Sequence, residues 1–378
     1  MSSNLITVCY VKNYIGSGGS SELFLEICNR ASDRYEFSVY GIEGGDESYM
    51  RKLKRHNISV SHANASSKVD LRALYRLYRY LEAHKFDIVH AHLPYAQVLC
   101  RLLCQPIQGT AVVSKQSSMP RNYHPITRTL EQVTQPLDTK TITATKAVQE
   151  AFTGSSNFYF EDPDTKWCTI HNGINVDDFN AKVKSADTSD ICENYELNRG
   201  PVLLNIGRYT PAKSQIDLIP VMKKVVQHIP DTTLLIVGYG DLERELIERI
   251  DRAGLSDNVH VTGRAESVHR YYKAADLFVL SSRTEGFGIV NLEAMCAELP
   301  IVATDIPAVR EIVNDGQTGE LVQVGNHQQM ADNILSILMN SEKKQAYSRC
   351  GLGRAQEHFD VSQMAAHYLN IYSKAARR

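Results

Sequence analysis

The sequence predicts an α/β protein made of two Rossmann-like halves, and three observations support this. Short apolar runs alternate with longer amphipathic segments along the chain, which is the pattern of a mostly parallel sheet covered by helices. The 378 residues exceed one ordinary domain and suit two domains of roughly 180 residues each. Each half also opens with a strand, a glycine-containing loop and a helix, as Rossmann-like domains do.

The composition argues against a nucleic-acid-binding, membrane-spanning or disulfide-rich protein. The formal net charge is −2, which argues against general nucleic-acid binding. No apolar run reaches the ~18 residues needed to span a membrane, and no charged leader with a cleavage site precedes the first strand. The eight cysteines are scattered, without a C-x-x-C or zinc-site spacing. We therefore expect a cytoplasmic protein with reduced thiols.

The first half alternates short strands with helices, the clearest helix being 70–84. We assign residues 1–180 to this domain, place the interdomain linker around 181–199, and assign 181–361 to the second domain. Strands are expected at 5–11, 36–42, 58–61, 86–92, 111–115, 141–144 and 167–173.

The loop after the first strand reads NYIGSGGS and leads into a helix over 21–31. Its glycines lack the G-x-G-x-x-G spacing, so no dinucleotide fingerprint is present. Gly18 and Gly19 form either a simple flexible turn or a place where the phosphates or another part of a ligand approach the backbone.

Two histidines close the strand that reads DIVHAH. At a spacing of two residues, His90 and His92 share one face of the strand. A structural histidine with satisfied hydrogen bonds is the common outcome for such a residue. The carboxyl end of a parallel strand is nevertheless where ligands bind, which makes His92 a candidate for contact with substrate.

The second half contains a strand–turn–helix–strand unit with two carboxylates, DLFVLSSRTEGFGIVNLEAMCAELPIVATD over 276–305. The helix, expected at 288–297, is mostly apolar. Glu293 within it faces solvent at the rim, or it is buried and bound by something, since burying a free carboxylate is costly. The sparse polar face of this helix favours a ligand.

Glu285 lies in the turn of this unit, directly before the glycine-containing start of the helix. The backbone N–H groups there, together with the helix N-terminus, form an anion site. A carboxylate beside an anion site suits a ligand with both hydroxyls and phosphates, such as a nucleotide sugar. The residues predicted to line the anion site are Gly286, Phe287, Gly288 and Ile289.

The second half begins with PVLLNIGRYTPAKSQIDLI, in which Gly207 allows a turn after a strand. Arg208 and Lys213 follow at that strand's carboxyl end and suit a pyrophosphate, the arginine as a planar fork and the lysine as a point charge. The alternative is two solvated surface charges. After the next strand, Gly238 and Gly240 would admit the nucleotide.

Together these motifs resemble the retaining glycosyltransferases of family 4, the glycosyl transferases of group 1, which have the GT-B fold. The resemblance rests on EGFGIVNLE followed by EAMCAELPIVATD, on G-R-x4-K, and on NGIN followed by phenylalanine. It implies two Rossmann-like domains facing a central cleft, with a final helix in 362–378 crossing back onto the first domain.

The resemblance also implies roles for individual residues. Glu285 and the amides after it would hold the donor sugar, and Glu293 the ribose hydroxyls. Arg208 and Lys213 would hold the donor phosphates, and Arg264 would lie near the base.

Family members usually carry a sugar-contacting histidine where this sequence has Gln116. Glutamine can hydrogen-bond a hydroxyl but cannot carry a proton at neutral pH. His124 or Lys115 could substitute for it. Arg121 in the same loop is a candidate for binding an acidic acceptor or a phosphate.

The implied reaction is the metal-independent transfer of a hexose, with retention, from a nucleotide-diphosphate sugar. A UDP-sugar is favoured over GDP-mannose, and the acceptor is a lipid-linked or envelope glycan of polysaccharide or lipopolysaccharide biosynthesis. No cofactor is expected, and the D-x-D at 162–164 is interpreted as chance. The alternatives are a nucleotide-sugar epimerase of the same fold, or a catalytically weak nucleotide-sugar-binding subunit, for which Gln116 is the supporting feature.

A final prediction concerns the membrane. Residues 51–101 carry an excess of basic side chains, several of them on the predicted helix 70–84. Such a helix suits an anionic headgroup layer, although an ordinary crossover helix has the same pattern. The apolar stripe of this helix, Leu71, Leu74, Tyr75, Tyr78 and Leu81, cannot serve the core and the membrane together. Peripheral docking at the inner face of the cell membrane would therefore be mainly electrostatic.

Overall fold

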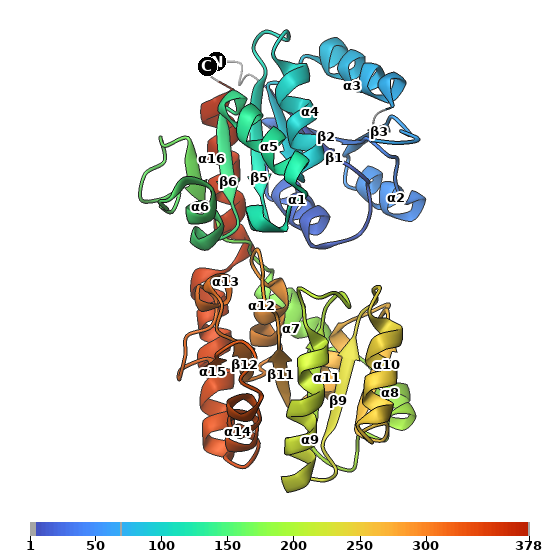
Figure 1. The fold of residues 1–378 in the computed structure, drawn as a ribbon. Coiled ribbons are helices and arrows are strands. Elements are labelled where there is room, and N and C mark those ends of the chain that lie inside the picture. The colour runs from blue at the N-terminus through green and yellow to red at the C-terminus, as the bar shows by residue number, and fades with distance from the viewer. Residues whose placement is uncertain (1–4, 69, 377–378) are drawn as a thin grey trace. The chain divides into compact units, whose positions relative to one another are not determined.

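The computed structural model describes residues 5–68 and 70–376. It divides into two compact units, one formed by Met1–Gly173 with Val361–Arg378 and the other by Ile174–Asp360. Each unit contains one parallel sheet flanked by helices (Figure 1). The predicted fold class of two Rossmann-like α/β domains is confirmed.

The first unit is built on a seven-stranded sheet with the order β3-β2-β1-β4-β5-β6-β7. Its strands are β1 (Ile6–Lys12), β2 (Tyr35–Gly41), β3 (Ser59–His62), β4 (Ile88–His92), β5 (Ala111–Gln116), β6 (Lys140–Thr143) and β7 (Trp167–Thr169). Its helices are α1 (Gly19–Asn29), α2 (Glu47–Arg55), α3 (Leu71–His84), α4 (Pro94–Cys104), α5 (Pro125–Thr134), α6 (Lys146–Thr153) and α16 (Val361–Ala375), with short 3₁₀ turns at Pro120–Asn122 and Gln135–Leu137.

The apolar pattern of the strands explains the layers of this unit. Side chains alternate between the two sheet faces, and each face has its own core. One core joins Val8 and Tyr10 of β1 to α1 and α16, while the other joins Cys9 and Val11 of β1 to α3 and α4. The last helix therefore belongs to the first unit, as predicted. Chain order reverses between β1 and β4, which places a topological switch point there.

The second unit has a six-stranded sheet with the order β10-β9-β8-β11-β12-β13. Its strands are β8 (Val202–Ile206), β9 (Thr233–Val237), β10 (Val259–Gly263), β11 (Leu277–Leu280), β12 (Ile301–Thr304) and β13 (Gly319–Val322). Its helices are α7 (Val176–Ser185), α8 (Ser189–Asn194), α9 (Leu218–His228), α10 (Glu243–Arg252), α11 (His269–Ala274), α12 (Ile289–Cys296), α13 (Pro307–Arg310), α14 (His327–Leu338) and α15 (Ser341–His358), with a 3₁₀ turn at Gln215–Asp217.

The region expected to be an irregular linker, 181–199, is instead largely helical. It contains the end of α7 and all of α8, and α7 lies wholly in the second unit. Phe179 of α7 packs against the rings of His269 and Tyr272 on α11. These long-range contacts fix the helix to the second sheet, and the polar composition of the segment gave no sign of them.

The apolar stripe of α3 faces the core only in part. The helix buries Ala73, Leu77 and Leu81, whereas Leu71 and Tyr75 are 77% and 63% exposed. The rotation of a helix on its sheet is set by the fit of both surfaces, and small Ala73 allows the closer approach. Two large apolar side chains are left on the outer surface as a result.

Candidate functional site

The predicted donor-site residues converge at the carboxyl ends of β8 and β11. These strands are hydrogen-bonded neighbours, and chain order reverses between them, so their loops flank the switch point of the second sheet. In open α/β sheets ligands bind outside such a point. The loop after β8 carries Arg208 and Lys213, and the loop after β11 carries Glu285.

Lys213 and Glu285 form an ion pair that joins the two loops. Glu285 is buried, and its Oε1 also accepts a hydrogen bond of 2.7 Å from Ser282 Oγ. Among the described residues no group donates to Oε2, so that oxygen remains available to a hydroxyl of a ligand. The pair therefore places a cation directly beside a carboxylate that has one open oxygen.

The loop that carries Glu285 is held in place from both sides. On one side, Thr304 Oγ1 of β12 donates a hydrogen bond to the carbonyl of Ser282 at 2.5 Å. On the other side, the backbone N–H of Arg283 donates to the carbonyl of Ala212 at 2.8 Å. The sequence analysis did not single out Ser282. Its position at a strand end, three residues before Glu285, could have indicated that its hydroxyl contacts the carboxylate.

The start of α12 is a tight turn that requires a glycine. Gly288 is the residue before the helix and has φ +90°, a left-handed conformation that favours glycine. A Cβ there would come within 2.9 Å of Asn291 Nδ2. Phe287 is buried and its ring lies near that of Phe359, with centroids 6.2 Å apart, which anchors the turn. Gly286 and Ile289 flank this turn and are partly exposed.

Glu293 lies in the middle of α12 and is partly exposed. Its Oε2 accepts a hydrogen bond of 2.8 Å from the Tyr272 hydroxyl, and desolvation raises the pKa of the carboxyl above its ordinary value. Tyr272 comes from α11, 21 residues earlier, and no local pattern pointed to it. Within the described residues, Tyr272 is the one donor to this carboxylate, so the carboxylate can accept further hydrogen bonds from vicinal hydroxyls.

The remaining cations of this edge are exposed. Arg208 has no ion-pair partner within the described part of the chain. The guanidinium of Arg264, at the end of β10, lies 5.4 Å from the ring centroid of Tyr239 after β9. Tyr239 is half exposed and could offer a planar surface to a base.

The glycines at the carboxyl edge of the second sheet differ in whether neighbouring atoms leave room for a side chain. At Gly238 a Cβ would stand 1.9 Å from the carbonyl oxygen of Gly207, and at Gly240 it would stand 2.4 Å from that of Tyr209. Both glycines are therefore required for the close packing of the loops after β8 and β9, whether or not a nucleotide approaches. A Cβ at Gly207 would make only ordinary contacts, the nearest at 3.5 Å.

In the first unit Gly18 and Gly19 lie at the start of α1, and a Cβ at either would meet nothing within 4 Å. The protein itself thus imposes no steric need for these glycines, which fits a surface kept open for a ligand.

The other candidates of the first unit differ in exposure. His92 is buried at the end of β4, and its Nδ1 lacks a hydrogen-bond partner among the described residues. Arg121 and His124 are exposed, on the loop before α5.

Gln116 is completely buried, which differs from its expected role as a sugar contact. Its Nε2 donates to Gln97 Oε1 at 2.9 Å and to Glu131 Oε2 at 2.8 Å, and its Oε1 accepts from the Tyr123 hydroxyl at 2.9 Å. In this conformation the amide has no group to offer a sugar. Its contacts instead fix the end of β5 against α4 and α5.

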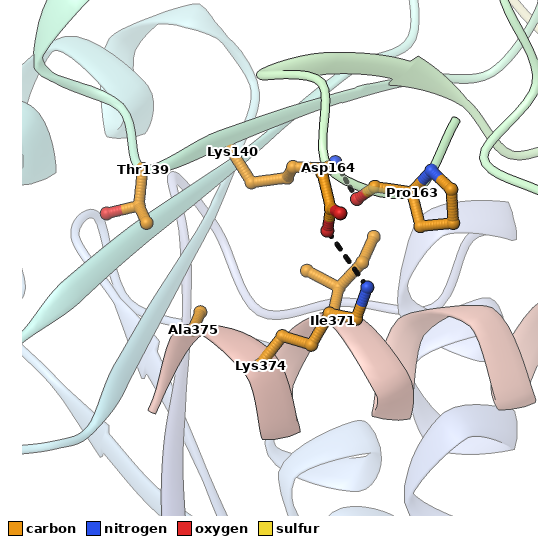
Figure 2. A pocket seen from close by; sticks show the side chains of 7 residues that line it. All are labelled: Thr139, Lys140, Pro163, Asp164, Ile371, Lys374 and Ala375. Carbon is orange, nitrogen blue, oxygen red and sulfur yellow. Dashed lines mark hydrogen bonds and ion pairs between the residues drawn. The ribbon is translucent and has the colours of Figure 1, made fainter. Parts of the chain in front are cut away.

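The D-x-D at 162–164 serves a structural contact. Figure 2 shows a small cavity in which Asp164 pairs with Lys374 at 3.0 Å, while Lys140 Nζ donates to the carbonyl of Pro163 at 2.8 Å. This cavity lies at the amino end of β6, away from the ligand edge. Within 5–68 and 70–376 no three His, Cys, Asp or Glu side chains gather as metal ligands would.

Comparison with known proteins gives two family matches. Residues 17–178 match the model of Glycosyltransferase Family 4, and residues 189–351 match that of the Glycosyl transferases group 1. A phosphatidyl-myo-inositol mannosyltransferase of Mycobacterium leprae is 28% identical over 306 residues, which is 80% of this chain and 77% of that protein. The lipopolysaccharide core biosynthesis mannosyltransferase LpsB of Rhizobium meliloti is 33% identical over 155 residues, which is 39% of this chain and 44% of that protein.

Among solved structures, Anabaena Alr3699/HepE in complex with UDP and glucose superposes with a TM-score of 0.83 at 21% identity. The match covers 98% of this chain and all of that one. A similarity at this identity shows the fold, which is GT-B.

Proposed function

The chain belongs to glycosyltransferase family 4, the glycosyl transferases of group 1, and we propose that it transfers a hexose, with retention, from a nucleotide-diphosphate sugar to a lipid-linked or envelope-glycan acceptor. A UDP-sugar is the favoured donor, supported by the UDP in the complex of HepE. GDP-mannose is the second candidate, supported by the mannosyltransferases among the relatives. The same relatives act on phosphatidylinositol and on the lipopolysaccharide core, as their names state, and this favours an acceptor of glycolipid or polysaccharide biosynthesis.

The observation that carries this proposal is the Lys213–Glu285 pair beside the start of α12. Cleavage of the donor leaves negative charge on the leaving diphosphate, and Arg208, Lys213 and the amides before α12 are the groups that would stabilise it. Such preorganised donors act without having to reorganise during the reaction. Glu285 would hold a sugar hydroxyl while the ring passes through an oxocarbenium-like state. We assign no general base, since the leaving phosphate can take the acceptor's proton.

The proposal is tested by incubating the protein with a panel of UDP- and GDP-sugars, with and without a lipid-linked acceptor, and analysing nucleotide and sugar products. Acceptor-dependent release of nucleotide with an α-linked product from an α-linked donor is expected. Isomerised free nucleotide sugar would instead identify an epimerase, and binding without turnover a donor-binding subunit.

We also propose that the reaction requires no divalent metal, so transfer activity should persist in EDTA. Loss of activity in EDTA, with recovery on adding Mg²⁺ or Mn²⁺, would contradict metal independence.

Arg208→Ala should lower kcat by roughly 100-fold or more, because the exposed guanidinium would stabilise charge that develops only as the diphosphate leaves. Steady-state kinetics with saturating donor measure this effect. Arg244→Ala on α10, also an exposed arginine, is the matched control and should leave kcat unchanged. If Arg208→Ala raises only the donor KM, the arginine binds donor and transition state equally well.

We also propose that the first unit docks peripherally on an anionic membrane, where a lipid-linked acceptor resides. Leu71 and Tyr75 protrude from α3 beside the exposed Arg72. The helix α5 presents a second exposed apolar row, and α4 packs against both helices. That row is Ile126, Leu130 and Val133, spaced four and three residues apart. In the part of the chain that is described, no helix has the length and hydropathy to cross a bilayer.

Co-sedimentation with liposomes tests this docking. Binding should require anionic lipid and fall steeply with salt, because each basic residue near the surface contributes about 1 kcal/mol. Arg72→Glu/Arg76→Glu on α3 should weaken binding, whereas Arg244→Glu/Arg252→Glu on α10 should not. If the wild-type protein stays in the supernatant with anionic vesicles at low salt, the membrane proposal is wrong.

A further inference from the structure

Three basic side chains stand in one row at the carboxyl edge of the first sheet. Val11 of β1 pairs with Ala91 of β4, so the next residues, Lys12 and His92, lie side by side, and His92 pairs in turn with Lys115 of β5. Neighbouring residues in a parallel sheet point to the same face, about 4.8 Å apart from strand to strand. We call Lys12, His92 and Lys115 the basic row.

The basic row is buried and lacks a carboxylate. Lys12, His92 and Lys115 are only 7%, 3% and 6% exposed. Lys12 Nζ donates to the hydroxyls of two serines at the start of α1, Ser20 and Ser21, and Lys115 Nζ donates to Asn172 Oδ1 at 2.6 Å. Neither lysine has an ion-pair partner among the described residues.

Among the described residues, the groups that accept hydrogen bonds from the two lysines are neutral. Lys115 Nζ lies 5.2 Å from the ring centroid of Tyr368 on α16. The carboxylate of Glu22 on α1 is paired with Lys52 at 2.8 Å, and its charge offsets only part of the effect of desolvation on the pKa of Lys12. Other buried cations of the same unit are satisfied differently: Arg101 contacts two carboxylates, and Lys140 donates to the backbone carbonyls of Pro163 and Thr165. Burying a cation without a counter-charge is unfavourable. An anion bound at the basic row would reduce this cost.

The titration of the row agrees with this geometry. Desolvation lowers the pKa of Lys12 to about 8 and that of Lys115 to about 7. Burial next to both lysines and to His90 keeps the pKa of His92 well below its ordinary value. A bound anion would raise both lysine pKa values, so binding near neutral pH would take up protons.

The location indicates which molecule would supply the anion. The row lies at the β1/β4 switch point, where ligands of such sheets bind. The first turn of α1 is tied to Lys12 through Ser20 and Ser21, and the N-terminal end of this helix adds positive potential. The donor diphosphate already has cations of its own, Arg208 and Lys213 in the second unit.

We propose that the basic row is an oxyanion subsite that receives a carboxylate or phosphate carried by the acceptor. This inference rests on the proposed function, which it deepens by assigning the acceptor to the class of acidic glycans or glycan phosphates. Lys12 and Lys115 would each donate a charge-assisted hydrogen bond to the anion. His92 between them would accept or donate one through its unpartnered Nδ1.

The subsite is tested by calorimetric titration of the full chain with inorganic phosphate, at constant ionic strength and with UDP saturating. Wild-type protein should bind phosphate with proton uptake, which is read from the enthalpies in two buffers of different ionisation enthalpy. Lys12→Met and Lys115→Met should each weaken binding about tenfold or more. Lys54→Met, an exposed lysine of α2, is the control and should bind as wild type does.

Each other outcome overturns the proposal. If UDP displaces the phosphate from wild-type protein, the anion belongs to the donor rather than the acceptor. If the variants bind phosphate as wild type does, or if wild type binds none, the row has only a structural role. Lys12→Met is the informative variant should Lys115→Met fail to fold. Because phosphate binding needs no turnover, its failure is distinguishable from a failure of sugar transfer in the donor panel.

Discussion

Glu285→Ala is expected to abolish sugar transfer while leaving UDP affinity nearly unchanged. Oε1 of Glu285 is committed to Lys213 and Ser282, and Oε2 is open to a hydroxyl of the donor sugar. Removing the carboxylate loses that contact in the transition state but frees Lys213 for the diphosphate, so nucleotide binding should persist. Turnover assays with the best donor, combined with calorimetric titration of UDP, measure the two effects.

Glu293→Ala should show the reverse pattern. If Glu293 binds the ribose hydroxyls, its loss should weaken UDP binding by about 1–3 kcal/mol, because hydroxyls in the site lose their partner. Glu342→Ala, an exposed carboxylate in the first turn of α15, is the control for both variants. Equal losses of UDP affinity in Glu285→Ala and Glu293→Ala would refute the division of roles.

Arg101→Met is expected to destabilise the first unit by about 3–5 kcal/mol, the cost of leaving buried carboxylates without their cation. The guanidinium contacts both oxygens of Asp138, at 2.9 and 2.8 Å, and Glu131 Oε2 at 2.8 Å, and all three side chains are almost fully buried. Thermal unfolding should show a midpoint lower by about 10 °C for a unit of this size.

Two further variants test whether the loss of stability in Arg101→Met comes from the buried carboxylates. Arg79→Met breaks an exposed ion pair with Glu82 and should cost less than about 1 kcal/mol. The triple variant Arg101→Met/Glu131→Gln/Asp138→Asn removes the uncompensated charges and should be more stable than Arg101→Met. An Arg101→Met midpoint no lower than that of Arg79→Met would contradict the argument.

The network around Arg101 also changes the interpretation of Gln116. The sequence presents Gln116 as a departure from the histidine usual in the family, and hence as a weak sugar contact. In the structure the amide is a member of this buried network, because Glu131, which accepts from it, comes from α5. That contact joins residues 15 apart through packing of α5 on α4, and no local pattern reports it.

The sequence by itself determined the fold class, nearly all the strands and the motif residues that meet at the carboxyl edge of the second sheet. Unbroken apolar runs such as the one that became β11 mark strands buried on both faces, and glycines and carboxylates at their ends are local features. Glu285, Arg208 and Lys213 were found this way. The final helix was also placed correctly by the family resemblance.

Only the tertiary structure decided which side chains pair and which face of a helix is buried. Lys213 and Glu285 are 72 residues apart and meet because β8 and β11 are neighbours. The basic row exists only because β1, β4 and β5 lie side by side in register. Strand order, register and helix rotation are set by long-range packing between surfaces, and a pattern that repeats every two or four residues carries no record of it.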